Sequence, residues 1–147
     1  MLAMEETIDL VIGKISTILG SSPLRKSAKF HGCSHDVFAL ESPSGQKWIL
    51  RVAKDEFAAE VANRSADIMK HILEKRPWLA IPAVVYADQS FTVLTYIEGT
   101  PILSWNTDSL SYQRRRTLLD GLAKFLHQLW TCPTPLAEPG KMYYICY

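Results

Sequence analysis

Two short stretches of the sequence carry residue types that can bind phosphate. A turn of small and polar residues, Gly32-Cys33-Ser34, separates two strand-like segments, and Arg51 interrupts the apolar run 48–52. Glycine lets backbone N–H groups come close to phosphate oxygens, and a guanidinium forms paired hydrogen bonds with phosphate. Together these stretches indicate a polyphosphate site. The alternatives are an ordinary hairpin turn and an arginine exposed at a sheet edge.

The position of Arg51 on its strand sets a further requirement. Side chains alternate along a strand, so Ile49 and Arg51 share one face, and the other three residues of the run share the opposite face. A charge among apolar neighbours is costly to bury unless it is paired. The helix predicted to follow offers Glu60 and, one turn earlier, Glu56. We expect a carboxylate from this helix to pair with Arg51.

A third stretch is suited to a nucleotide base. The apolar strand 91–96 runs into Tyr96-Ile97-Glu98, and Gly99-Thr100-Pro101 then breaks the pattern. An extended linker exposes backbone donors and acceptors, which can pair with the edge of adenine. The alternative interpretation is a buried strand followed by a turn.

Periodicity predicts the elements that must position these stretches. Apolar residues at helical spacing predict helices over 5–19, 55–75 and 109–130, with Gly20 as the C-cap of the first and Asp55 as the N-cap of the second. Strands are predicted near 25–31, 36–41, 47–53, 81–86 and 91–96. The order predicts an α+β lobe, with a five-stranded, mostly antiparallel sheet and one helix packed on it.

Composition excludes several classes of protein. The 147 residues are 48% hydrophobic and 21% charged with a net charge of +1, so neither nucleic acid nor an anionic membrane is expected as a partner. Cys33, Cys132 and Cys146 share no C-x-x-C spacing, which leaves zinc and dithiol chemistry unsupported. Acidic residues stand near the N-terminus, where a targeting peptide would be basic or apolar. We therefore expect a cytoplasmic protein.

At this point the sequence resembles the aminoglycoside phosphotransferase family, the small-molecule branch of the protein-kinase-like fold, and most closely its divergent fungal members. The matching stretches are 30–40, 47–52, 60–62, 81–85, 94–101 and 122–129. The resemblance implies a protein-kinase-like N-lobe and hinge over 24–99, preceded by an N-terminal helix in 1–23. It implies the start of a truncated C-lobe, with its first helix, over 100–147.

The resemblance also implies roles for individual residues. The phosphate side would comprise the loop Gly32, Cys33 and Ser34, then Arg51, with Glu60 as its helix partner and Glu56 as the alternative. The adenine side would comprise the side chains of Val37, Ile49 and Leu94 and the backbones of Tyr96 and Ile97. The implied cofactor is ATP, and magnesium is expected in the full family fold.

One departure from the family limits the expected activity. The catalytic loop (H-G-D followed by an asparagine) and the metal-binding D-x-D should follow the helix 109–130, and neither occurs before Tyr147. These residues orient the acceptor hydroxyl and hold magnesium. We therefore identify no catalytic residue and no metal ligand in this chain.

Three hypotheses follow. The first is the N-terminal part of a small-molecule kinase that transfers the ATP γ-phosphate to a hydroxyl and is inactive alone. The second is a non-catalytic lobe that binds nucleotide or a protein, and the third is an unrelated α+β interaction domain. A small-molecule acceptor is expected only if a second lobe exists. The sequence identifies neither that acceptor nor the oligomeric state.

Overall fold

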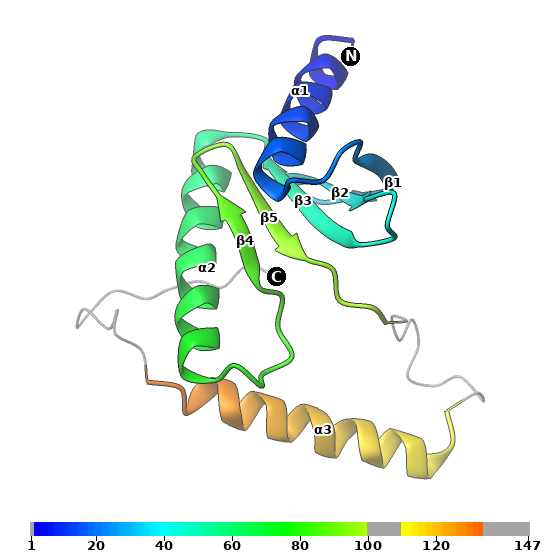
Figure 1. The fold of residues 1–147 in the computed structure, drawn as a ribbon. Coiled ribbons are helices and arrows are strands. Elements are labelled where there is room, and N and C mark those ends of the chain that lie inside the picture. The colour runs from blue at the N-terminus through cyan, green and yellow to red at the C-terminus, as the bar shows by residue number, and fades with distance from the viewer. Residues whose placement is uncertain (1, 100–109, 134–147) are drawn as a thin grey trace. The chain divides into compact units, whose positions relative to one another are not determined.

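The computed structural model describes residues 2–99 and 110–133. In chain order its elements are α1 (Leu2–Leu19), β1 (Arg25–His31), β2 (His35–Glu41), β3 (Lys47–Ala53), α2 (Glu56–Lys75), β4 (Val84–Ala87), β5 (Phe91–Thr95) and α3 (Tyr112–Trp130) (Figure 1). The chain divides into two compact units. The first unit comprises residues 1–66 and 84–96, and the second comprises 67–83 and 97–147.

The first unit is built on a five-stranded sheet with strand order β1-β2-β3-β5-β4. Each neighbouring pair of strands runs antiparallel. This confirms the α+β class and the predicted sheet. The β2–β3 turn contains Gly45 with φ of 83°, a left-handed conformation that glycine adopts without steric cost.

Helix α1 covers one face of this sheet. Ile8, Ile12 and Ile15 recur at helical spacing and are buried. They pack with alternate strand residues in one core, namely Phe38, Leu40, Trp48, Leu50, Phe91 and Val93. The helix ends as predicted at Gly20, whose φ is 60°, and the Ser21 N–H donates to the Ser16 carbonyl at 3.0 Å. This is a Schellman-type C-terminus.

Helix α2 begins where its capping residue predicts. The Asp55 carboxylate accepts a hydrogen bond from the Ala58 N–H at 2.7 Å, which satisfies a backbone donor of the first turn. Within the first unit, α2 buries a row of small residues spaced by four: Ala58, Ala62 and Ala66. Such small side chains let a helix approach its neighbours closely.

The second unit has its own small core. Ile72, Leu79 and Cys132 are buried there, and Ile68, Ile81, Phe125 and Leu129 pack against them. Arg76 donates to the carbonyl of Gln128 and to the carbonyl and hydroxyl of Thr131, the latter two at 2.8 and 3.1 Å. The last carbonyls of a helix have no partner within it, so Arg76 satisfies the C-terminal end of α3.

Two predicted boundaries shift for identifiable reasons. Strand β4 begins at Val84 and not at residue 81, because Pro82 has no N–H to offer a sheet. Helix α3 begins at Tyr112, and the Ser111 hydroxyl accepts from the Arg114 N–H at 3.3 Å. The earlier start predicted at 109 and the break at 100–101 lie outside the described residues.

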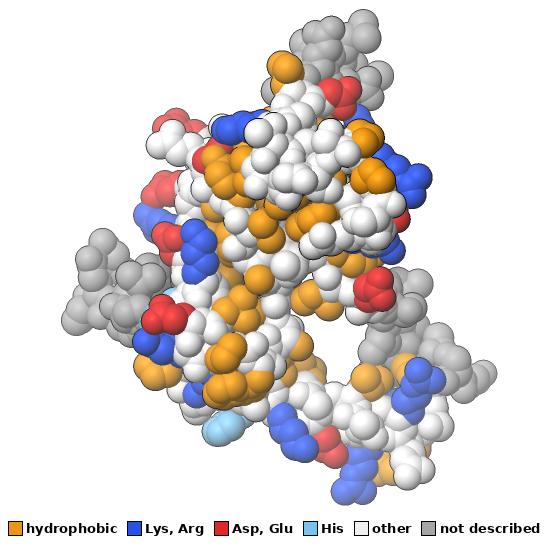
Figure 2. All heavy atoms as spheres, in the orientation of Figure 1, with side chains coloured by type: hydrophobic (Ala, Val, Ile, Leu, Met, Phe, Trp, Pro, Cys, Tyr) orange, Lys and Arg blue, Asp and Glu red, His pale blue; other side chains and the backbone are white. Residues whose placement is uncertain are grey.

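The surface carries charges of both signs. On the face shown in Figure 2, basic and acidic side chains are interspersed and do not gather into a large patch of one sign. Of the helices that the structure describes, none combines the length and apolar character needed to cross a membrane.

Candidate functional site

The sheet face opposite α1 brings together the predicted contacts of the nucleotide. Arg51 on β3 lies directly opposite Val37 on β2 and opposite Thr92 on β5. Two residues earlier on β3, Ile49 lies opposite Leu94 on β5. Since directly opposite residues share a face, an apolar group of three side chains adjoins one guanidinium. The roles of these residues toward adenine and phosphate stay predictions.

Arg51 is half-buried, and burial lowers the pKa of its guanidinium. Arg51 makes no hydrogen bond or ion pair with the described residues. The expected ion pair with Glu60 is not formed, because Glu60 pairs with Arg64 one turn along the exposed side of α2. Glu56 is also exposed. The role of Glu60 as the partner of Arg51 therefore stays a prediction.

Two further polar side chains lie on the same face. His35 is two residues before Val37 and is 6% exposed, while Thr92 is 1% exposed. Within the described part of the chain, His35 Nε2 and Thr92 Oγ1 have no hydrogen-bond partner. Burial, together with the positive charge of Arg51, lowers the pKa of His35. Buried polar atoms without partners are costly and uncommon, so His35 and Thr92 add a polar, covered patch beside the half-buried Arg51.

The predicted phosphate loop closes the β1–β2 end of this face. A Cβ atom at Gly32 would lie 2.6 Å from the His35 carbonyl oxygen, so only glycine fits this approach of the backbone. Cys33 and Ser34 are exposed. The Lys54 ammonium donates to the carbonyls of Gly32 at 2.7 Å and Cys33 at 3.4 Å. A basic residue just after β3 thus contacts the loop.

The predicted hinge follows β5. Tyr96 is half-buried and belongs to the first unit, whereas Ile97 is exposed and belongs to the second. The Lys47 ammonium lies 5.6 Å from the centre of the Tyr96 ring. The pairing of these two backbones with adenine stays a prediction.

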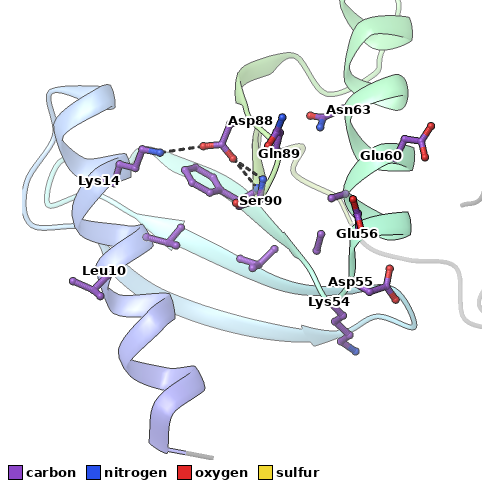
Figure 3. A pocket seen from close by; sticks show the side chains of 15 residues that line it. Leu10, Lys14, Lys54, Asp55, Glu56, Glu60, Asn63, Asp88, Gln89 and Ser90 are labelled. Carbon is purple, nitrogen blue, oxygen red and sulfur yellow. Dashed lines mark hydrogen bonds and ion pairs between the residues drawn. The ribbon is translucent and has the colours of Figure 1, made fainter.

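A groove of about 950 Å³ lies elsewhere in the first unit, between α1, the end of β3, the start of α2 and the β4–β5 turn. Figure 3 shows Lys14 and Asp88 on one side of it and Glu56, Glu60 and Asn63 on the other. Apart from Glu60 and its alternative Glu56, none of the predicted nucleotide contacts lines this groove. It is therefore distinct from the face that carries Arg51.

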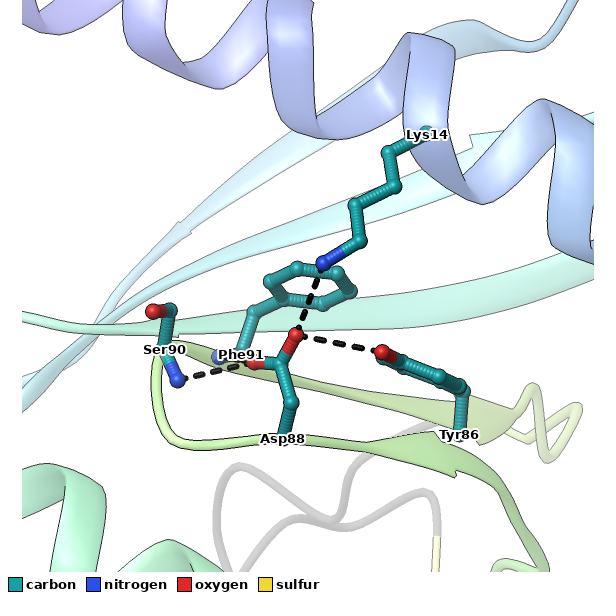
Figure 4. A network of polar contacts seen from close by, with 5 residues as sticks. All are labelled: Lys14, Tyr86, Asp88, Ser90 and Phe91. Carbon is teal, nitrogen blue, oxygen red and sulfur yellow. Dashed lines mark hydrogen bonds and ion pairs between the residues drawn. The ribbon is translucent and has the colours of Figure 1, made fainter.

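Asp88 organises the rim of this groove. One carboxylate oxygen accepts from the Lys14 ammonium at 3.1 Å and from the Tyr86 hydroxyl at 3.2 Å (Figure 4). The other accepts from the N–H groups of Ser90 and Phe91 at 2.8 and 3.0 Å. Burial opposes ionisation, but these two N–H groups and the ammonium outweigh it and lower the pKa of Asp88. The network fastens α1 to the β4–β5 turn.

Sequence reasoning missed three residues of the site: His35, Lys54 and Thr92. Strand alternation from Val37 and Leu94 places the first and the last on the correct face, so this signal was available. Lys54 had no such signal, because its contact with the loop depends on how β3 ends. Within 2–99 and 110–133, no group of three or more His, Cys, Asp or Glu side chains is placed to hold a metal ion.

Solved structures share this fold. The gentamicin complex of APH(2'')-IIa matches with a TM-score of 0.70 and 22% identity, covering 85% of this chain and 40% of that protein. ADP-bound APH(2'')-Ib matches with a TM-score of 0.66 and 22% identity, covering 83% and 39%. The macrolide 2'-phosphotransferase MphH from Brachybacterium faecium gives 0.52 and 19%, covering 70% and 37%. The chain thus spans about two fifths of their length.

The sequence comparisons complete the assignment. No curated protein matches the chain significantly in sequence. Residues 30–142, however, match the phosphotransferase enzyme family, APH. This match covers most of the chain, and its α+β sheet is that of a kinase-like N-terminal lobe. The chain therefore belongs to the phosphotransferase enzyme family.

Proposed function

We propose that this chain forms the nucleotide-binding part of an ATP-dependent phosphotransferase that acts on the hydroxyl of a small molecule. The observation that carries the proposal is the half-buried Arg51, which makes no hydrogen bond or ion pair with the described residues and shares its sheet face with the apolar side chains of Val37 and Ile49. Two similar structures add support, since one is a ternary complex with streptomycin and ATP and another is ADP-bound.

The residues present fit a nucleotide. Phosphate oxygens are acceptors for the Arg51 fork, and their charge compensates a guanidinium that burial has partly desolvated. Gly32 permits the close approach of the loop to the His35 carbonyl, where a Cβ atom would clash, and the loop would cover the polyphosphate. Val37, Ile49 and Leu94 form an apolar surface suited to the face of a base. Backbone groups of Tyr96 and Ile97 would select adenine by its edge.

In this proposal the chain binds and orients ATP, and it contributes few groups to the phosphoryl-transfer step itself. ATP supplies the transferable phosphoryl group when bound. Arg51 holds phosphate oxygens, and neutralising their charge is a large part of phosphoryl-transfer catalysis. The 147-residue sequence contains no H-x-D and no D-x-D. Transfer would therefore require an aspartate base and metal ligands from polypeptide outside this sequence, and the chain alone would bind without transferring. A cytoplasmic location also remains part of the proposal.

The test compares ATP binding to the 147-residue chain and its Arg51→Met variant by isothermal titration calorimetry. Loss of a charged hydrogen-bond donor costs roughly 1.5–3 kcal/mol, so we expect affinity to fall by about tenfold or more. Arg116→Met, an exposed position on α3 with the same charge change, is the matched control. Equal affinity of wild type and Arg51→Met would refute the proposed site.

Protein binding is the alternative, and one observation favours it. Among its described side chains α3 buries none, and it exposes Tyr112, Leu119, Leu122 and Trp130. Exposed apolar surface of this kind marks interfaces. If sedimentation shows self-association or complex formation that Leu119→Ser and Leu122→Ser abolish, and calorimetry shows no nucleotide binding, this alternative replaces the first.

A further inference from the structure

A lysine that follows β3 holds the backbone of the loop between β1 and β2. Lys54 contacts the carbonyls of all three loop residues: its ammonium donates to Gly32 at 2.7 Å and Cys33 at 3.4 Å, and its backbone N–H donates to Ser34 at 3.1 Å. The Asp36 carboxylate lies 4.0 Å from the same ammonium. Lys54 is exposed, so burial does not explain its side-chain position.

These contacts determine where the loop's donors point. In a trans peptide the C=O and the following N–H point in opposite directions. Because the carbonyls of Gly32 and Cys33 face the Lys54 ammonium, the N–H groups of Cys33 and Ser34 point away from it. Two successive N–H groups directed to one side are a common way for a backbone to hold an anion.

The residue that follows links this arrangement to α2. Lys54 is the first residue after β3, and Asp55 caps α2 through the Ala58 N–H at 2.7 Å. Figure 3 shows Lys54 and Asp55 side by side at this junction. Arg51 stands three residues earlier on the same strand. The end of β3 therefore positions the phosphate-binding guanidinium, the loop and the helix start together.

We propose that Lys54 is a positioning residue that turns the loop Gly32-Cys33-Ser34 so that its N–H groups face the polyphosphate of a bound nucleotide. This inference rests on the proposed function. Lys54 acts through the loop backbone, and its ammonium is already engaged by carbonyl oxygens. Its removal should weaken the binding of phosphates selectively and leave the binding of the base unchanged.

The experiment uses the full 147-residue chain with Lys54→Met, which keeps the length of the side chain and removes the ammonium, and with Lys54→Arg, which restores a donor. Lys70→Met, at an exposed position of α2 in the second unit, controls for the change in net charge. Calorimetry measures the affinity of each variant for ATP, ADP and adenosine. Backbone ¹⁵N relaxation measures the order of the loop amides without any nucleotide.

We expect Lys54→Met to weaken ATP and ADP about tenfold, in keeping with loss of a charged donor, and to leave adenosine affinity unchanged. Lys54→Arg should recover most of the loss. In the free protein, order parameters of Cys33 and Ser34 should fall from about 0.85 to below about 0.6 in Lys54→Met, and Lys70→Met should match wild type.

The contrary outcomes are distinct. Unchanged order parameters in Lys54→Met, or equal weakening of adenosine and ATP, would overturn the inference while wild-type binding still supports the proposed function. A wild-type chain that binds no nucleotide at all would overturn the proposed function, and the role of Lys54 toward phosphate would fall with it.

Discussion

The two faces of the sheet in the first unit differ sharply although the same strands build both. On the α1 face, Leu40, Leu50 and Val93 are 0% exposed and belong to one continuous apolar core. The opposite face carries His35, Arg51 and Thr92, and in the described part of the chain His35 Nε2 and Thr92 Oγ1 have no hydrogen-bond partner. One face satisfies its residues within the fold, and the other does not.

Residues on the α1 face mainly stabilise the fold, whereas the polar residues on the opposite face are the ones that the proposed function uses. Apolar burial stabilises a fold by roughly 25 cal/mol per Å², so the buried side chains on the α1 face stabilise the protein without any ligand. Buried polar atoms without partners work against stability. In the proposed function a nucleotide would instead complete the half-buried Arg51, which lies opposite Thr92 on this face. Substitutions on the two faces should therefore have opposite consequences.

The largest expected loss of stability is at the sheet face that packs against α1. Leu50→Ala opens a cavity among residues that are fully buried, and such changes cost about 2–5 kcal/mol. Urea denaturation of the 147-residue chain measures this loss. Leu122→Ala, at a position 52% exposed on α3, should cost far less. Comparable losses at the two positions would mean that the α1 face is not the main core.

A reciprocal exchange compares the two faces at adjacent residues. Thr92 is 1% exposed and lacks a partner for its hydroxyl in the described chain, while Val93 is 0% exposed and apolar. Thr92→Val removes an unsatisfied group without changing shape, so the free energy of unfolding should rise. Val93→Thr buries a new hydroxyl and should cost about 1–3 kcal/mol.

Urea denaturation measures both variants, and the sign of each change is the readout. A stability loss in Thr92→Val would show that its hydroxyl has a partner in solution, and the contrast between the faces would then disappear. ATP affinity of Thr92→Val should not rise, because the substitution removes a polar group next to Arg51.

The sheet face that packs against α1 was predictable from sequence, because the signals that define it lie close together along the chain. Helical spacing identified Ile8, Ile12 and Ile15, and alternation separated Trp48 and Leu50 from Ile49 and Arg51. Both Gly20 and Asp55 were recognised as helix caps because capping depends on residues close in sequence. Local rules therefore fixed which face of each element is apolar.

The sheet face opposite α1, which carries Arg51, was predictable only in part. Alternation placed Val37 and Arg51 together, but it could not show that Glu60 would pair with Arg64, since two carboxylates and two cations were within reach along the chain. The contact of Lys54 with the loop joins residues 22 apart in sequence. Such contacts depend on how strands end and turn, which no periodicity encodes.

Acidification should lower the stability of the chain through His35, which lies on the sheet face opposite α1. Burial and the nearby Arg51 charge lower the pKa of His35 from its ordinary 6.5, so unfolding between the two pKa values takes up a proton and stability rises with pH there. The stabilising contribution is complete above pH 6.5 and declines as the pH falls through that value toward the folded pKa. Lys54 and Asp55 also face His35 and act in opposite directions.

The measurement is the free energy of unfolding of wild type and His35→Gln from pH 8 to pH 5. The difference between the two curves isolates His35 from the other histidines. We expect wild type to lose stability on acidification more steeply than His35→Gln. Parallel curves would show that His35 titrates normally in the folded chain, and that this face is more hydrated than its burial indicates.

The smallest effects are expected at the charges that fasten α1 to the β4–β5 turn. Lys14 is exposed and pairs with Asp88 at 3.1 Å, and exposed ion pairs contribute little because water and salt screen them. Lys14→Met should therefore lower stability slightly, and the loss should shrink further at high salt. Asp88→Ala should cost more, because it also removes the acceptor of the Ser90 and Phe91 N–H groups.

The pH dependence of Asp88 supplies an internal check. Its pKa is lowered in the folded chain, so its contribution is present above the ordinary value of 3.8 and is lost as the pH falls through the folded pKa. Thermal denaturation of wild type and Asp88→Ala should therefore converge in acid. If Lys14→Met instead lowers the free energy of unfolding as much as Leu50→Ala does, the ion pair with Asp88 holds α1 on the sheet more than the apolar core does.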